Sequence, residues 1–177
     1  MCFFKDKWPK LIPYNEEEAE KVKAYLAETK GINNIGDLIE FIKPFTRKED
    51  IKDYWQSAYE TYLRKTYDCE DMVIMIQEIL KRKLKIENPW FVIYGGYFIK
   101  EGKRTYSEHA VCIFENSMQM SYYEFTNKTY REAYNPIYNN IMLYGKRHYP
   151  EGLKYYERRN NEGKIIEKKR AWIGYLK

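Results

Sequence analysis

The segment Tyr67-Asp68-Cys69-Glu70-Asp71, followed by the largely apolar run Met72–Leu80, decides how this chain is organised. Asp68 is a typical helix N-cap, because its carboxylate can accept the backbone N–H three residues on, and Asp71 can reach back to the N–H of the cap. The segment therefore predicts a helix that begins at Cys69. Because its first two turns are apolar on nearly every face, we expect this helix to be buried.

The position of Cys69 in the first helical turn favours a nucleophilic thiol. Unpaired N–H groups and the positive end of the helix dipole both stabilise a thiolate at such a position. An inert core cysteine is the alternative interpretation, and the neighbouring acids Asp68 and Glu70 oppose a low thiol pKa. An activating base must therefore come from elsewhere in the chain.

Length and composition predict one globular domain that spans residues 1–177. The chain is 44% hydrophobic and 18% aromatic, and no internal linker divides it. No apolar run approaches the ~18 residues of a membrane span, and the N-terminus lacks the apolar core of a secretory signal. We therefore expect no membrane association and a cytoplasmic location, including the host cytoplasm if the chain is virus-encoded.

Charge and cysteine usage argue against several kinds of site. The net charge is +5, but the basic residues are scattered, as on a solvated surface, so specific nucleic-acid binding is not favoured. The three cysteines, Cys2, Cys69 and Cys112, form an odd set without a CxxC spacing. Neither a disulfide framework nor a zinc site is indicated, and we expect no required cofactor.

The order of the predicted elements indicates an α+β domain, because helices come first and antiparallel strands follow. Helices are expected over Glu16–Thr29, over Ile35–Ile42, from Thr46 or Asp50 to Arg64, and from Cys69 to the basic run Lys81-Arg82-Lys83. Strands are expected over Trp90–Tyr94 (with Tyr97–Lys100 beyond a glycine pair), His109–Phe114, Tyr122–Phe125, Leu153–Arg158 and Lys164–Trp172.

His109 is the candidate base, because it begins a predicted strand and His148 is the only other histidine. If a short loop centres on Asn116-Ser117, His109 lies directly opposite Glu124, with Cβ atoms ~4.5–5.5 Å apart. A carboxylate that orients an imidazole beside a thiol is the arrangement of a catalytic triad. A loop one residue longer or shorter would make the pairing diagonal. Asn127 is the alternative orienting residue, and a strand-end histidine that serves solubility is the alternative interpretation of His109.

Four segments occur in a characteristic order: Trp55-Gln56-Ser57-Ala58-Tyr59-Glu60, Asp68-Cys69-Glu70-Asp71, His109-Ala110-Val111 and Glu124-Phe125-Thr126. Over about residues 50–130 the chain resembles the bacterial transglutaminase-like cysteine peptidases. Those proteins carry a Trp-x-x-x-x-Glu segment, a Gly-Asp-Cys-Glu-Asp box, a His-x-Val strand start and an acidic residue on the next strand. The resemblance implies a papain/transglutaminase-like fold, in which the Cys-bearing helix packs on an antiparallel sheet.

The chain departs from the pattern of this family at two positions. Tyr67 stands where the family usually has glycine, which would narrow the approach to the thiol, and Glu124 stands where it usually has aspartate. Asp68 and Glu70 match acids that bind calcium in some periplasmic members. The alternative role of these two acids is helix capping and solvation.

The resemblance implies an acyl-transfer enzyme with the triad Cys69, His109 and Glu124. Cys69 would attack an amide or thioester carbonyl of a protein or peptide substrate, and its backbone N–H would meet the oxyanion. A second donor would come from Trp55 or Gln56, which otherwise are core or groove-wall residues. Hydrolysis by a peptidase or amidase and transfer to an amine both remain open.

Two functions from other classes remain as alternatives. A catalytically silent relative would act as a binding or assembly module, with ordinary thiol reactivity and a groove blocked by side chains such as Tyr67. A small basic nucleic-acid-binding protein would show an affinity that falls steeply with salt. The first of these is the main alternative.

Overall fold

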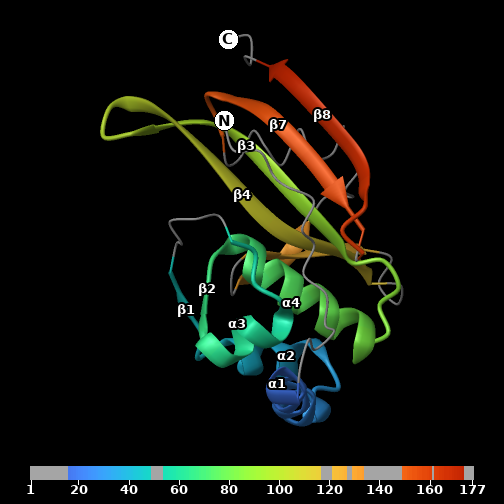
Figure 1. Cartoon of the computed structure of the whole chain (residues 1–177). Coiled ribbons are helices and arrows are strands. Elements are labelled where there is room, and N and C mark those ends of the chain that lie inside the picture. The colour runs from blue at the N-terminus through green and yellow to red at the C-terminus, as the bar shows by residue number, and fades with distance from the viewer. Residues whose placement is uncertain are drawn as a thin grey trace.

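The computed structural model of the chain describes residues 16–48, 54–116, 121–126, 129–133, 149–160 and 162–173. In these residues, helices cover one face of a six-stranded antiparallel sheet, whose strand order is β6-β5-β4-β3-β7-β8 (Figure 1). The helices are α1 (Glu16–Glu28), η1 (Thr29–Gly31, a 3-10 turn), α2 (Ile35–Ile42), α3 (Ala58–Arg64) and α4 (Cys69–Arg82). The prediction of an α+β arrangement is confirmed.

The strands follow the helices along the chain, except for the short pair β1 (Thr46–Arg47) and β2 (Thr66–Tyr67). The sheet consists of β3 (Trp90–Lys100), β4 (Lys103–Asn116), β5 (Ser121–Thr126), β6 (Thr129–Ala133), β7 (Gly152–Arg159) and β8 (Ile165–Ile173). Antiparallel pairing of β7 with β8 confirms the C-terminal hairpin that the sequence predicts.

The helix α4 begins at Cys69 and is buried along its length, as its apolar sequence predicts. Its side chains pack against the helix-facing side of β3, β4 and β5, and the largest buried members of this main core include Met72, Met75, Ile76, Phe91, Phe114 and Phe125. A second core lies on the other face of the sheet and contains Val92, Tyr94, Val111, Ile113, Tyr149, Leu153 and Tyr156. No helix within the described ranges has the length and apolar character needed to cross a membrane.

The first β-hairpin is longer than the sequence predicts. The strand β3 continues through Gly95 and Gly96 to Lys100, and the turn consists of Glu101 and Gly102, whose φ angles are 52° and 75°. Positive φ at both central residues gives the turn type that joins twisted antiparallel strands tightly. The second strand therefore starts at Lys103, and His109 lies inside β4 and not at its mouth.

The predicted register between β4 and β5 is wrong. Glu124 pairs with Ile113, and Asn116 pairs with Ser121, so the pairing is not centred on Asn116-Ser117. The four residues from Ile113 to His109 correspond to about 13 Å along a strand. The direct pair of His109 with Glu124 does not form.

The predicted helix that ends at Arg64 is shorter than expected. It begins at Ala58, because Ser57 caps it and exchanges hydrogen bonds with Glu60 in a capping box. Thr46 and Arg47, which we expected near a helix start, instead form β1 and pair in parallel with Thr66 and Tyr67. This two-residue ladder holds the backbone of Thr66 and Tyr67, directly before the cap residue Asp68 and Cys69.

Candidate active site

A reciprocal capping box fixes the start of α4. The Asp71 backbone N–H donates to Asp68 Oδ1, and the Asp68 N–H donates to Asp71 Oδ2, each over 3.1 Å. Both carboxylates are buried, and Asp71 is fully inaccessible. The predicted capping arrangement is confirmed, and it puts Cys69 at the first helical position.

Gln56 is held against the same helix start. Its backbone N–H donates to Asp71 Oδ1 over 2.7 Å, and its side-chain Nε2 donates to Asp71 Oδ2 over 2.6 Å. These two bonds fix which end of the carboxamide faces Asp71. In the described part of the chain, the buried Gln56 Oε1 has no hydrogen-bond partner. Asp71 thus joins the segment before α3 to the turn that carries the thiol.

Trp55 lies beside Gln56 and is clamped between the sheet and a buried cation. Its ring stacks on Phe91 with centroids 5.2 Å apart, and the Arg159 guanidinium lies 5.4 Å from the ring centre. Arg159 pairs with the inaccessible Glu157 carboxylate, which also accepts from Lys168 over 2.8 Å. Trp55 is therefore a fixed wall of the site.

The Cys69 thiol is buried. It donates a hydrogen bond to Glu70 Oε2 over 2.9 Å, and 8% of the residue is exposed. Burial raises the pKa of the thiol most strongly, and the charge and hydrogen bond of Glu70 raise it further. The backbone N–H of Ala110, which hydrogen-bonds the sulfur, acts in the opposite direction. The sulfur thus lies between a carboxylate of its own helix and the backbone of β4.

His109 is the residue that precedes Ala110, so the backbone brings it next to the sulfur. The peptide bond between them keeps the His109 Cα within roughly 6 Å of Sγ. Side chains alternate along a strand, and Ala110 and Cys112 pack against the α4 face. The half-buried His109 ring consequently extends from the opposite face of the sheet. There it meets Tyr94 edge-on, with ring centroids 5.8 Å apart. The described pairing of β5 with β4 begins at Cys112, so no strand among the described residues flanks this side of β4 at His109.

Tyr149 belongs to the site, and the sequence analysis missed it. Its ring meets Tyr94 edge-on at 5.7 Å, and its hydroxyl lies 3.3 Å from the Ser107 hydroxyl. Burial raises the pKa of Tyr149 to about 12; the hydrogen bond with Ser107 acts in the opposite direction, and the nearby Glu108 carboxylate raises it further. A sequence signal existed in Gly96, because glycine within a strand often marks a close approach of other chain atoms. A Cβ on Gly96 would lie 2.7 Å from the Tyr149 side chain.

The remaining predicted site residues have different placements. Tyr67 is buried in the main core and packs there with Cys69. The backbone of Glu124 pairs with Ile113 and Arg131, so the contact on which its assignment depended does not form. Asn127 lies outside the described residues.

The acids beside Cys69 bond to protein groups. Asp68 accepts the Asp71 N–H, and Glu70 accepts the thiol. Among the residues that the structure describes, no group of three or more His, Cys, Asp or Glu side chains is arranged to hold a metal ion.

Comparison with models of known protein families gives no match for this chain, and comparison with curated proteins gives none either. The resemblance to the transglutaminase-like peptidases therefore stays a prediction from the sequence.

Proposed function

We propose that this protein is a cysteine-dependent acyl-transfer enzyme of papain/transglutaminase-like fold, a peptidase or amidase that forms a thioester intermediate on Cys69. One observation carries the proposal. The sulfur at the first position of the buried helix α4 accepts the Ala110 N–H, one residue from His109. A thiol and a helix N-terminus thus lie within one residue of the His109 backbone, at the open edge of β4.

The proposed reaction needs His109 to replace Glu70 as the partner of the thiol. A carboxylate is a poor base for this thiol, because the pKa of Cys69 is raised while ordinary carboxyl groups titrate near 4. An imidazole titrates near 6.5 and accepts the proton in the neutral pH range. Rotation about the side-chain bonds of Cys69 and His109, with the imidazole passing around the open edge of β4, would exchange the two partners.

The chemical steps follow from that exchange. His109 takes the thiol proton, and the thiolate forms a bond to the substrate carbonyl carbon while the π electrons move to oxygen. When the C–N bond breaks, the leaving amine receives the proton from the imidazolium. Water then attacks the thioester carbon and gives a proton to His109; the C–S bond breaks, the carboxylic acid leaves, and the imidazolium returns the proton to the Cys69 sulfur. An amine in place of water would give transamidation.

The start of α4 would stabilise the oxyanion. The Cys69 N–H is one of the first N–H groups of a helix, which have no partner within the helix. Gln56 is the proposed second donor, because its carboxamide is fixed at Asp71 with Nε2 turned toward the helix start. We assign no carboxylate to His109, because Glu124 pairs with Ile113.

One observation favours the second candidate, a silent member of this fold that acts as a binding module. Burial and Glu70 raise the pKa of Cys69, whereas an activated nucleophile has a lowered one. In this candidate the Cys69–Glu70 hydrogen bond is a permanent feature of the core.

Alkylation of Cys69 by iodoacetamide as a function of pH distinguishes the two candidates. The enzyme predicts an alkylation rate that depends on a group titrating near 6 to 7, and predicts loss of that dependence in His109→Ala. Cys112, whose pKa burial also raises, serves as an internal control that reacts slowly in both proteins. A rate that rises only above the ordinary thiol pKa, equally with and without His109, would refute the enzyme and support the silent module.

A further inference from the structure

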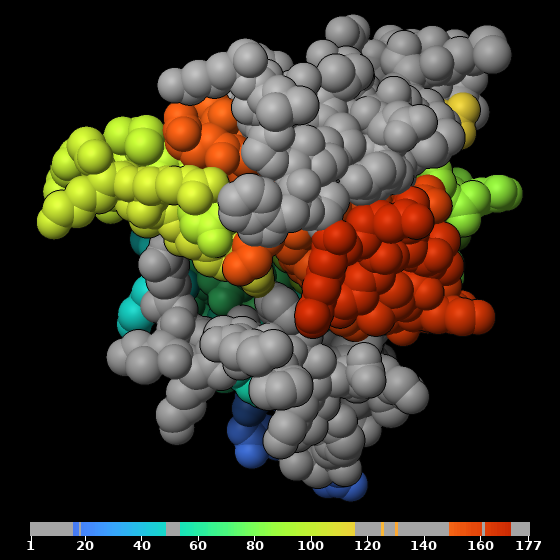
Figure 2. All heavy atoms as spheres, turned by 90° about the horizontal axis from the view of Figure 1, so that it is seen from above, coloured from blue at the N-terminus to red at the C-terminus, as the bar shows by residue number. Residues whose placement is uncertain are grey.

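The outer edge of β4 is open over half of its length. The strand pairs with β3 from Lys103 to Ile113, but β5 covers its other side only from Cys112 to Asn116. Among the described residues, the stretch Lys103–Val111 has a strand partner on one side only. Figure 1 shows this hairpin extending past the helices, and Figure 2 shows it from above, projecting beyond β7.

The backbone groups of this edge point toward the thiol side. In an antiparallel ladder both backbone groups of a residue face the same neighbour, and successive residues alternate. Because the Ala110 N–H bonds to the Cys69 sulfur and not to β3, the groups of Glu108, Tyr106 and Arg104 also face outward. No bulge interrupts the β3–β4 register, so the alternation holds along the whole stretch. No bond to another backbone segment is described for these outward groups.

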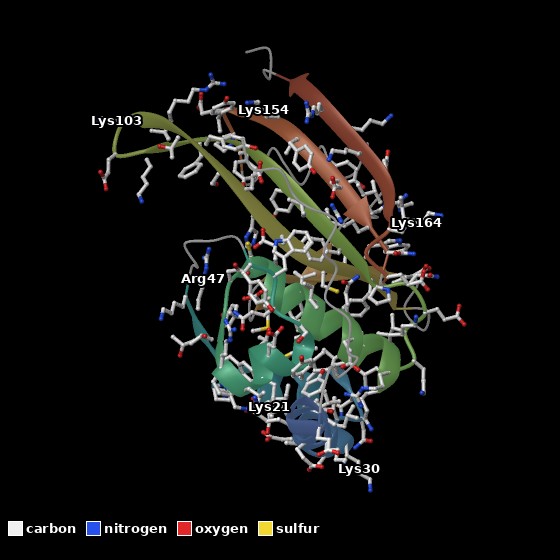
Figure 3. All side chains as sticks on the ribbon, in the orientation of Figure 1. Lys21, Lys30, Arg47, Lys103, Lys154 and Lys164 are labelled. Atoms are coloured by element: carbon white, nitrogen blue, oxygen red, sulfur yellow. The ribbon has the colours of Figure 1, made fainter. Side chains whose placement is uncertain are left out.

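The side chains at the edge do not shield its backbone. Tyr106 donates to the Glu108 carboxylate over 2.5 Å, and the Arg104 guanidinium lies 4.0 Å from the Tyr97 ring centre. These contacts hold the side chains on the sheet face, while Tyr106 remains 39% exposed. Lys103 lies at the end of the hairpin (Figure 3). Long edges are usually protected by prolines, bulges or charged side chains. This stretch contains no proline or bulge, and the contacts above hold its charged residues Arg104 and Glu108 on the sheet face.

We propose that the edge of β4 from Arg104 to Glu108 binds an extended segment of a polypeptide substrate as an added strand and delivers one of its carbonyl groups to Cys69. This inference rests on the proposed function and deepens it, because it makes the substrate an unfolded or extended chain recognised through its backbone.

The position of the sulfur supports this occupant. Outward-facing residues recur about every 6.7 Å along a strand. Ala110 is the next outward residue after Glu108, and there the sulfur takes the place of a strand partner. A peptide that pairs with Tyr106 and Glu108 therefore reaches the thiol with its next outward carbonyl. If the edge only paired two copies of this chain, its position beside a cysteine would have no explanation.

The test follows backbone amide exchange by NMR in the full chain carrying Cys69→Ala, which cannot form a thioester. The probe is reduced and carboxymethylated α-lactalbumin, a chain that stays unfolded. The outward amides of Tyr106 and Glu108 should exchange at least ~10-fold more slowly with the probe bound. The amides of Thr105 and Ser107, which already donate to β3, should not change. Unchanged exchange at Tyr106 and Glu108 would overturn the proposal, and so would a dimer that protects this edge without the probe.

A pair of variants isolates the contribution of the backbone. Tyr106→Pro and Tyr106→Val both remove the ring, but only proline removes the outward N–H, which edge positions tolerate. Probe binding should weaken at least ~10-fold in Tyr106→Pro relative to Tyr106→Val. Equal binding by the two variants would overturn the proposal. If Tyr106→Pro does not fold, the exchange pattern of the Cys69→Ala chain decides alone.

The outcomes separate this inference from the proposed function. Alkylation by iodoacetamide reports the Cys69 thiol without any strand pairing, and amide exchange reports the edge without any chemistry at Cys69. A reactive thiol with an unprotected edge refutes strand addition alone. An edge that is protected beside an inert thiol refutes the enzyme, and the edge is then a peptide-binding surface.

Discussion

At the start of α4, the contacts that shape the site come from one capping box and one neighbouring segment, whereas around His109 they come from two strands and from the segment before β7. The single Asp71 carboxylate accepts hydrogen bonds from both Asp68 and Gln56. His109 instead meets Tyr94 of β3, and Tyr94 meets Tyr149, which precedes β7. The helical half thus depends on local spacing, and the sheet half depends on strand register. The two halves should therefore respond differently to mutation.

Removal of the Asp71 carboxylate should have the largest effect on stability. Asp71→Ala deletes three hydrogen bonds to a buried carboxylate and leaves the Gln56 N–H without its acceptor. We expect the free energy of unfolding to fall by about 4 kcal/mol, measured by urea denaturation. Glu60→Ala is the matched control, because Glu60 also accepts three hydrogen bonds but is half-exposed, and it should cost about 1 kcal/mol. Equal losses would show that burial at Asp71 is unimportant.

The sheet half should be most sensitive at Gly96. A Cβ there would lie 2.5 Å from the Gly152 carbonyl oxygen and 2.7 Å from the Tyr149 side chain, so β3 and β7 must separate. We expect Gly96→Ala to cost about 3 kcal/mol in urea denaturation. Gly31→Ala, where nothing lies within 4 Å of the added atom, should leave stability nearly unchanged. A loss below 1 kcal/mol at Gly96 would mean that Tyr149 is not fixed at the sheet.

The same contrast explains which parts of the structure the sequence could predict. The spacing of Asp68 and Asp71 specifies a cap whatever surrounds it, so the start of α4 and the place of Cys69 were predictable. A pairing register depends on loop length, and a small shift changes every cross-strand neighbour. The observed register, with Asn116 opposite Ser121, therefore places Glu124 opposite Ile113 and not opposite His109.

The helices and strands also differ in whether the local sequence or a distant contact specifies them. The helix Ile35–Ile42 was predictable because Asn34 caps it and accepts the Asp37 N–H. The strand β1 was not, because Thr46 and Arg47 form it only by pairing with Thr66 and Tyr67, a contact that no local pattern encodes. Tyr149 was missed for a related reason, since its place depends on the glycine at position 96 of another strand.

The buried thiol should make stability depend on pH above its ordinary pKa. An unfolded thiol releases its proton near 8.5, whereas burial and Glu70 raise the pKa of Cys69 in the folded protein. The native state then binds more protons than the unfolded state, so stability falls as the pH rises above about 8.5, by up to ~1.4 kcal/mol per pH unit. Cys69→Ser should remove that part of the slope in urea denaturation between pH 8 and 10. Identical slopes in the two proteins would mean that the folded thiol ionises normally.

The smallest expected effect concerns Glu70 and separates its charge from burial. Because the charge and hydrogen bond of Glu70 contribute to the raised pKa of Cys69, Glu70→Gln should lower that pKa without changing the size of the side chain. We expect Cys69 to react with iodoacetamide about fivefold faster at pH 8. Glu87→Gln, an exposed change beyond the other end of α4, should leave the rate unchanged. A rate that did not rise in Glu70→Gln would assign the raised pKa to burial alone, and the exchange of Glu70 for His109 would then not be enough to activate the thiol.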